Sequence, residues 1–239
     1  MAQPAETSTA ALAVSTVIFA LRSHDRFGAS AETPSIWLPL VRRIREPFAS
    51  RWALPGGPLG GAESLEDAAR RTLHETTAIE PGYLEQLYAF GDVDRSPGER
   101  VISIVYWALV ASVQARRATT GQNVRWFPAD GLPELAFDHN RIVDYALWRL
   151  RNKMEYSSIA HALIGDAFTL AQLREVYEAV LGKRLDPANF RRAIEASESL
   201  VDTGEVLTGT RHRPPRLYRF DTSAASTSAP PLRAAKGES

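Results

Sequence analysis

The pattern of hydrophobic and polar positions over roughly the first 150 residues predicts a set of strands around one central helix. Runs rich in Val, Ile, Phe, Trp and Leu, bounded by polar or glycine-containing stretches, are typical of strands. The sequence has such runs at residues 11–21, 35–43, 84–91, 101–113 and 123–127. Apolar residues at mixed helical spacing within residues 139–150 predict a closing helix.

The central helix is predicted after residue 64. Its apolar positions recur at roughly helical spacing and would form one buried face; they are Leu65, Ala68, Ala69, Leu73 and Thr76. Ser64 is a suitable N-cap, with Asp67 at the third helical position as in a capping box. Pro81 and Gly82 would end the helix.

A different pattern follows residue 152. It begins with a short helix at residues 157–163, and a helix capped by Thr169 and stopped by Gly182 comes next. Asp186 and Pro187 form a strong start for a third helix. Two strands follow, at residues 201–208 and 216–220, with a turn between them. This order is typical of a winged helix-turn-helix, so we predict one domain at residues 11–152 and another at residues 153–221.

Composition narrows the possible functions. The chain has no cysteine, which excludes a disulfide framework, thiolate zinc and a cysteine nucleophile. Its formal net charge is zero, so a nucleic-acid site must come from local clustering of cations. Residues 1–10 and 222–239 are small and polar, and we expect them to be disordered. The first apolar run is too short to span a membrane, so we expect a cytoplasmic protein without a membrane partner.

Basic residues cluster in the second domain, around its third helix and its hairpin. The candidates for DNA binding are Lys183, Arg184, Asn189, Arg191, Arg192, Arg211, His212, Arg213 and Arg216. Asn189 and Arg192 share a helix face, so we assign them to base edges; Arg191 and the hairpin cations would contact phosphates. The expected partner is double-stranded operator DNA, and the alternative is a solvated basic face in a protein-interaction domain.

A spaced motif in the first domain resembles the Nudix box, G-x5-E-x7-R-E-U-x-E-E-x-G-U. The matching residues are Gly57, Glu63, Arg71, Leu73, Glu75 and Ile79, preceded by the usual lead-in Trp52-Ala53-Leu54-Pro55-Gly56. The resemblance implies an α/β/α sandwich, so the fold class is α+β, a Nudix sandwich followed by a winged helix-turn-helix. The chain departs from the pattern at Thr72, Thr76 and Ala78.

Two of these departures fall where a Nudix hydrolase has glutamates that hold magnesium. Magnesium prefers oxygen ligands with negative charge, and a threonine hydroxyl is a poor substitute. We therefore predict no catalytic residues, no bound metal and weak or no hydrolysis. A helix with no role in ligand binding is the plainer alternative.

Together the two domains resemble the NrtR-type family of Nudix-related transcriptional regulators. The resemblance extends to Leu135–His139, residues 91–100 and Arg216–Phe220. It implies a repressor of NAD-metabolism genes that senses ADP-ribose, or a related nucleoside diphosphate, and then releases its operator, with no required cofactor. Reading a pseudo-palindromic operator would require a homodimer. The alternatives are a magnesium-dependent ADP-ribose pyrophosphatase that uses Glu63, Glu66 and Asp67, and a pure interaction protein.

An ADP-ribose pocket needs cations for the pyrophosphate and an aromatic surface for the adenine. Our candidates for ligand binding are Arg43, Phe48, Trp52, Gly56, Gly57, Arg71, Glu75, Arg95, Arg100 and His139. Structural alternatives remain open for three of them. Trp52 would equally suit core packing, Arg71 the orientation of a carboxylate, and His139 the start of a helix.

Overall fold

The structure is a computed structural model that describes residues 9–22, 34–117, 123–156, 158–209 and 214–221. Within these residues the chain forms two compact units. One contains residues 9–19, Trp37–Ala108 and residues 123–146; the other contains residues 20–22 and 34–36, Leu109–Arg117 and the described residues from Leu147 onward. The disorder predicted for the two termini falls almost entirely outside the described residues, as do the hairpin residues Arg211, His212 and Arg213.

Seven strands of the described chain form one sheet in the order β3-β2-β1-β6-β5, with β4 on β1 and β7 on β2. The strands are β1 Ala11–Arg22, β2 Ser35–Arg42, β3 Trp52–Ala53, β4 Gly56–Pro58, β5 Tyr83–Phe90, β6 Val101–Val110 and β7 Val124–Pro128. Residues with no exposed surface line its centre, among them Phe19, Leu38 and Trp107. The long strands are therefore held by apolar burial.

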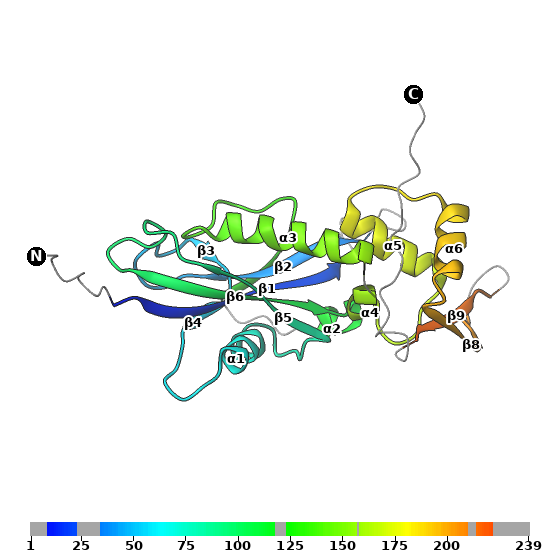
Figure 1. Ribbon diagram of the computed structural model, residues 1–239, viewed down its shortest axis with the longest axis horizontal. Coiled ribbons are helices and arrows are strands. Elements are labelled where there is room, and N and C mark those ends of the chain that lie inside the picture. The colour runs from blue at the N-terminus through cyan, green and yellow to red at the C-terminus, as the bar shows by residue number, and fades with distance from the viewer. Residues whose placement is uncertain (1–8, 23–33, 118–122, 157, 210–213, 222–239) are drawn as a thin grey trace, which may run out of the picture. The chain divides into compact units, whose positions relative to one another are not determined.

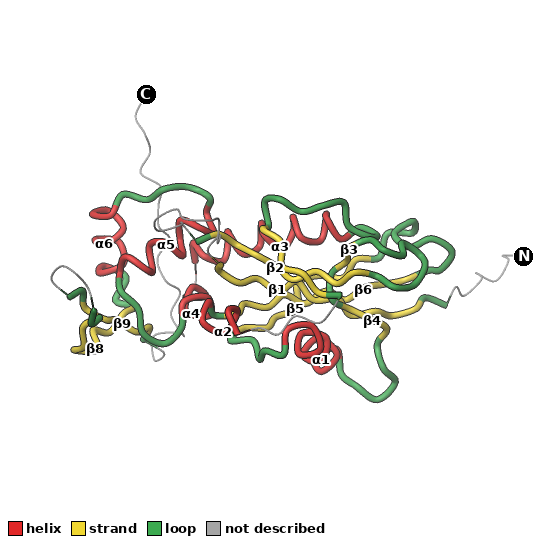
Figure 2. Tube along the Cα trace, turned by 180° about the vertical axis from the view of Figure 1, so that it is seen from behind, coloured by secondary structure: helices red, strands yellow, loops and turns green. Residues whose placement is uncertain are grey.

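Helices cover the sheet on opposite faces (Figure 1 and, from behind, Figure 2). Helix α1, Leu65–Thr77, lies on one face, and α3, His139–Tyr156, lies on the other. On α1 the buried face includes Ala68, Ala69 and Leu73, as the spacing predicted. This layering is the α/β/α sandwich expected from the sequence, although α3 runs six residues beyond the predicted end at residue 150.

Three local predictions for this unit need correction. The strand predicted to reach residue 113 ends at Val110, and Ser112–Arg117 form the short helix α2, in a stretch that contains the good helix formers Gln, Ala and Arg. The capping box on α1 is incomplete: the Ser64 hydroxyl accepts from the Asp67 N–H, but the Asp67 carboxylate accepts from that hydroxyl. The helix ends at Thr77, and Ala78 follows it in the left-handed region.

The second unit has the predicted order of short helices followed by a hairpin. Its elements are the 3-10 turn η1 Ser158–Ala160, α4 His161–Ile164, α5 Leu170–Leu181, α6 Pro187–Ala196, β8 Leu200–Val206 and β9 Arg216–Phe220. Thr169 and Gln172 form a full capping box on α5, and Gly182 ends that helix at a φ of 67°. Asp186 caps α6, with Pro187 at its first position. These three predictions are confirmed.

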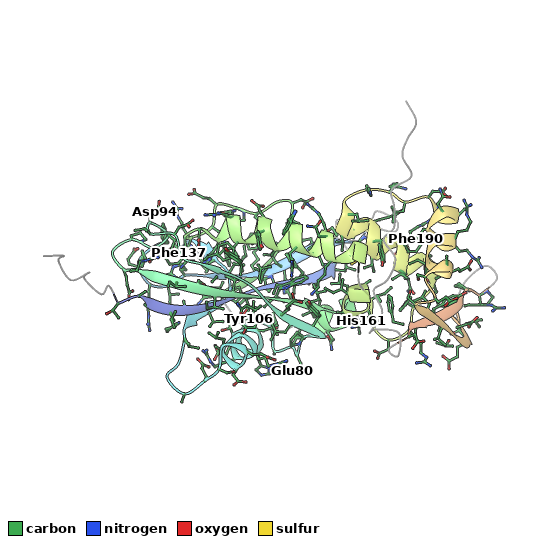
Figure 3. All side chains as sticks on the ribbon, in the orientation of Figure 1. Glu80, Asp94, Tyr106, Phe137, His161 and Phe190 are labelled. Carbon is green, nitrogen blue, oxygen red and sulfur yellow. The ribbon has the colours of Figure 1, made fainter. Side chains whose placement is uncertain are left out.

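A small apolar core supports α6. Phe190, labelled in Figure 3, is buried and packs edge-on against Tyr177 of α5, with their ring centroids 5.4 Å apart. Phe168 exchanges two backbone hydrogen bonds with Tyr218 of β9, at 3.0 and 2.8 Å, which ties the hairpin to the segment before α5. None of the described helices is long and apolar enough to cross a membrane.

Candidate functional site

A pocket of about 430 Å³ lies within the first unit, beside α1. Three segments form its wall: the end of β2 with the residues that follow it, the lead-in to the box, and one face of α1. The lining residues are Val41, Arg42, Arg43, Ile44, Arg45, Ala53, Leu54, Pro55, Gly56, Gly57, Pro58, Thr72, Glu75, Thr76 and Val124. Of the ten residues predicted to bind ligand, Arg43, Gly56, Gly57 and Glu75 are among them.

The lead-in is fixed to the sheet through β4. Gly57 pairs with Val14 of β1. A Cβ atom on Gly56 would lie 2.7 Å from the Val14 carbonyl oxygen and 2.8 Å from the Ser15 hydroxyl. Only glycine therefore allows this strand to approach so closely. As a result, the backbone at residues 56–57 forms part of the pocket wall.

His139 holds the other end of the lead-in. It is buried, and its Nδ1 accepts a hydrogen bond of 3.0 Å from the Leu54 backbone N–H. Burial lowers the pKa of His139 to about 3, so the imidazole is neutral, as an accepting Nδ1 requires. The structural alternative for His139 agrees with the structure, since His139 is the first residue of α3; its side chain positions Leu54 and does not line the pocket.

Arg71 also contacts protein groups instead of lining the pocket. Its guanidinium donates two hydrogen bonds to Glu63, at 3.0 and 2.8 Å, and reaches Glu75 at 3.5 Å. The bond to Glu63 raises the pKa of Arg71, and the same bond lowers the pKa of Glu63. Glu63 accepts a further bond of 2.8 Å from the Gly60 N–H. The structure thus favours the view that Arg71 orients carboxylates.

Thr72 and Thr76 occupy the pocket wall at the positions where the Nudix box has glutamates. Both are 5% exposed. The Thr76 hydroxyl donates a 2.7 Å hydrogen bond to the Thr72 carbonyl oxygen, one helical turn earlier. Glu75 is the one carboxylate in the lining. Among the described residues, no three His, Asp or Glu side chains form a group that could hold a metal ion.

Arg43 is a cation of the pocket that protein groups hold in place. Its Nε donates to the Pro47 carbonyl oxygen at 2.8 Å, and its guanidinium lies over the Phe137 ring, 4.6 Å from the centroid. Burial lowers the pKa of Arg43 from its ordinary value. Phe48 packs edge-on against Phe137 at 5.0 Å. Phe48 and Phe137 both have positive φ, at 67° and 57°, a strained conformation for bulky residues that often marks functional sites.

Two aromatic candidates lie outside the pocket. Phe48 is engaged with Phe137 and with the Arg51 guanidinium 5.5 Å from its centroid. Trp52 packs edge-on against Phe127 at 5.0 Å, and its carbonyl oxygen accepts a 2.8 Å bond from the Ala136 N–H. Trp52 is half-buried, and neither ring lines the pocket.

Two predicted pyrophosphate cations also lie elsewhere. Arg95 is 8% exposed, and its guanidinium forms two hydrogen bonds, of 3.1 and 2.8 Å, with Asp138. Arg100 donates to the Asp92 carbonyl oxygen at 3.0 Å. The lining instead contains Arg42 and Arg45, which we did not predict. Their signal in the sequence is the basic run Val-Arg-Arg-Ile-Arg at the end of the second strand.

The exposed face of α6 carries the predicted base-reading pair. Arg192 donates a hydrogen bond to the Asn189 side-chain oxygen, so the two residues share a face as expected. Arg191 lies apart from them and pairs with Glu195 at 2.8 Å. Lys183 and Arg184 are exposed in the turn before the helix. The face therefore presents cations and one amide at its surface.

Arg216 of the hairpin is paired with an acid from the opposite strand. Asp202 of β8 accepts a 2.8 Å bond from Arg216. Bonds from the Gly204 N–H and from Arg216 lower the pKa of Asp202, and Asp202 raises the pKa of Arg216. A groove of about 940 Å³ runs between Arg191 of α6 and this hairpin, and Arg216 also lines it.

Comparisons with known proteins match both units. Residues 24–146 match the NUDIX domain family, and residues 160–220 match the NrtR DNA-binding winged helix domain. A curated relative, the ADPR responsive transcriptional repressor NtrR of Acinetobacter baylyi, is 32% identical over 196 residues, 80% of this chain and 78% of the relative. The ADP-ribose pyrophosphatase of Methanocaldococcus jannaschii is 34% identical over 111 residues, 46% of this chain and 66% of that enzyme.

Solved structures show the same two-part likeness. The Shewanella oneidensis NrtR complexed with a 27mer DNA is 34% identical, with a TM-score of 0.74 over 91% of this chain and 96% of that one. The structure of the same Shewanella protein alone has a TM-score of 0.75 over 91% of this chain and 97% of that one. These matches confirm the predicted fold class, a Nudix domain followed by a winged helix.

Proposed function

Because the chain belongs to the NrtR family of Nudix-related transcriptional regulators, we propose that it represses NAD-metabolism genes and leaves its operator when ADP-ribose binds. The combination of an altered pocket and a basic helix carries the proposal. The Nudix pocket is lined by cations and glycine backbone, but two of its metal-binding positions are threonine. An exposed basic helix follows in a winged-helix domain. The relative in Acinetobacter, named for its response to ADPR, supports the effector class.

Operator DNA is bound by the second domain, which we place at residues 153–221. Asn189 and Arg192 share the exposed face of α6 and are assigned to base edges in the major groove. Lys183, Arg184 and Arg191 contact phosphates, which fix the position of the helix without reading sequence. Arg216 contributes less than a free cation, because Asp202 already pairs with it.

The effector occupies the pocket of the first domain, residues 11–152. Gly56 and Gly57 bring their backbone close to the phosphates, and Arg43 supplies a fixed cation. The response requires that ADP-ribose bind better to the state that cannot dock on DNA. No cofactor takes part in this equilibrium.

Hydrolysis is the alternative function, favoured by the likeness to the Methanocaldococcus pyrophosphatase. We propose that this chain is not such an enzyme. Thr72 and Thr76 offer no charge to a magnesium ion, and the Thr76 hydroxyl is engaged with its own helix. Glu63, which matches the box, is already bound by Arg71 and by the Gly60 N–H.

The assembly that fits this function is a cytoplasmic homodimer. Winged-helix repressors read pseudo-palindromic operators with one recognition helix on each half-site, and a two-fold symmetric protein provides that pair. Analytical ultracentrifugation of the protein with and without an operator duplex tests the assignment, and a monomer bound to a single half-site refutes it.

The function is tested in one gel-shift titration. The full chain is mixed with DNA from upstream of NAD-synthesis genes in its own genome, with and without ADP-ribose, and AMP release is followed in the same tubes. Specific binding that ADP-ribose abolishes, without AMP, supports the repressor. Magnesium-dependent AMP release without specific DNA binding establishes the pyrophosphatase in its place. A duplex of scrambled sequence is the matched control.

A further inference from the structure

We propose that the Nudix pocket neutralises the pyrophosphate of its ligand with Arg42, Arg43 and Arg45, and that it binds this ligand without a magnesium ion. This inference rests on the proposed function, since it takes ADP-ribose as the ligand. It adds which side chains hold the pyrophosphate, and it makes the binding of the effector independent of a divalent metal ion.

The oxygen donors of the pocket do not suit magnesium. The α1 face that lines the pocket offers Glu75 and two threonines, and Glu75 also lies 3.5 Å from the Arg71 guanidinium. The nearest box carboxylate in sequence, Glu63, accepts three hydrogen bonds from Arg71 and the Gly60 N–H. Magnesium is usually held by one or two carboxylates, with waters and substrate phosphates completing its octahedral shell, and both carboxylates available here are already bound by Arg71. The residues present therefore do not fit the metal that the Nudix family implies.

The charges in the pocket wall favour an anion directly. The lining contains three arginines and one glutamate, so its formal charge is +3 − 1 = +2. A pyrophosphate diester carries one negative charge on each phosphate, which this wall matches. A wall with glutamates at positions 72 and 76 would instead carry no net charge and would need a cation between itself and the phosphates. Arginine is well suited to the task because its planar fork donates two parallel bonds to phosphate oxygens.

The arginine segment is also held in a defined shape. Backbone bonds join the Arg43 N–H to the Arg51 carbonyl at 2.9 Å and the Ser50 N–H to the Arg43 carbonyl at 2.8 Å. The Arg42 Nε donates to the Ser50 carbonyl oxygen at 3.3 Å. With Arg43 fixed over the Phe137 ring, less side-chain freedom is lost when a phosphate binds. Ser50, like Phe48 and Phe137, has a positive φ, so three of the four non-glycine residues with positive φ in the described part of the first unit lie around these cations; the fourth is Ala78 at the end of α1.

Calorimetric titration of the full chain with ADP-ribose tests the inference, once in EDTA and once in millimolar magnesium. Affinities that agree within about threefold support it. Binding that is at least about tenfold tighter in magnesium overturns it and leaves the repressor function standing. If ADP-ribose binds under neither condition, the proposed function itself fails, so the two failures are distinguishable.

Variants assign the effect to the arginines. Arg43→Ala should weaken ADP-ribose binding in EDTA by roughly ten- to hundredfold, the loss expected for one charge-assisted hydrogen bond. Arg70→Ala is the matched control: Arg70 is an exposed arginine of α1 that pairs with Glu66 and does not line the pocket. It should bind ADP-ribose as the parent does. Equal affinity in both variants and the parent refutes the assignment.

Restoring the carboxylates provides the converse test. The double variant Thr72→Glu, Thr76→Glu brings the formal charge of the wall to zero, so ADP-ribose binding in EDTA should fall at least about tenfold and magnesium should recover part of it. Affinity unchanged in EDTA contradicts the charge argument. Both positions are buried, so the folding of the double variant is checked by tryptophan fluorescence. The titration of the parent chain tests the inference even if the double variant does not fold.

Discussion

A buried ion pair ties the loop between β5 and β6 to the start of α3, and we expect it to support the fold strongly. The Arg95 and Asp138 side chains are 5% and 13% exposed, and two hydrogen bonds of 3.1 and 2.8 Å join them. Arg95→Met keeps much of the volume but leaves the carboxylate without its partner in a buried site. Removing one member of such a pair typically costs about 3–5 kcal/mol of stability.

A double-mutant cycle separates the interaction energy of the pair from the separate effects of the two side chains. Asp138→Asn in the Arg95→Met background removes the unpaired charge, so part of the lost stability should return. A coupling free energy of about 1.5–3 kcal/mol is expected, the range for hydrogen bonds between charged groups. Arg141→Met is the matched control, because Arg141 pairs with Asp92 on the surface, where both side chains are more than half exposed. Its cost should stay below about 1 kcal/mol.

Urea unfolding followed by tryptophan fluorescence is the appropriate assay. Four of the five tryptophans lie in the first unit and the fifth is Trp148 of α3, so the signal reports mainly the first unit. An Arg95→Met variant within about 0.5 kcal/mol of the parent refutes the argument, as does a purely additive double variant. An intact fold combined with a loss of ADP-ribose affinity would instead restore Arg95 as a pyrophosphate contact.

Three further predictions follow from single positions. Burial lowers the pKa of His139 to about 3, against about 6.5 in the unfolded chain, so only the unfolded chain binds the proton between these two pH values. The free energy of unfolding should therefore fall by about 1.4 kcal/mol per pH unit as the pH drops from 6.5. The variant His139→Asn should flatten this slope in urea titrations at several pH values. Ala78 ends α1 at a φ of 55°, so Ala78→Gly should stabilise the chain by up to about 1 kcal/mol in the same assay. In anisotropy titrations Arg192→Ala should weaken operator binding by roughly 1–3 kcal/mol and relax its sequence preference, whereas Arg191→Ala should weaken operator and scrambled DNA alike.

Helix ends of the winged helix could be predicted because their causes are local. The caps at Thr169 and Asp186 bond to backbone groups three residues away, and Gly182 needs only its own left-handed conformation. All of this is visible in a short stretch of sequence. Strands β3 and β4 were not predicted, because two or three residues carry no periodicity of their own. They exist through pairing with β2 and β1.

The site was harder to predict because its contacts join distant residues. Arg95 looked like a ligand cation in a charged loop, but its partner Asp138 lies 43 positions later. His139 suited a ligand site and the start of a helix equally, and the group it holds, the Leu54 N–H, lies 85 positions earlier. Local sequence gives no sign of either partner. Arg43 was among the predicted cations, and its neighbours Arg42 and Arg45 in the same basic run line the pocket as well.

The repressor mechanism has a thermodynamic consequence that does not depend on knowing the path between the two domains. If ADP-ribose lowers operator affinity by a given factor, the operator must lower ADP-ribose affinity by the same factor. A hundredfold effect corresponds to a coupling free energy of about 2.7 kcal/mol. We expect the dissociation constant of ADP-ribose, measured by calorimetry, to rise by this shared factor in saturating operator duplex and to stay unchanged in scrambled duplex at the same salt concentration. DNA could be released in the gel shift without a matching change in ADP-ribose affinity. That result would show that ADP-ribose does not act through a single binding equilibrium. Hydrolysis of ADP-ribose during the assay, detected as AMP, would then be the explanation to examine.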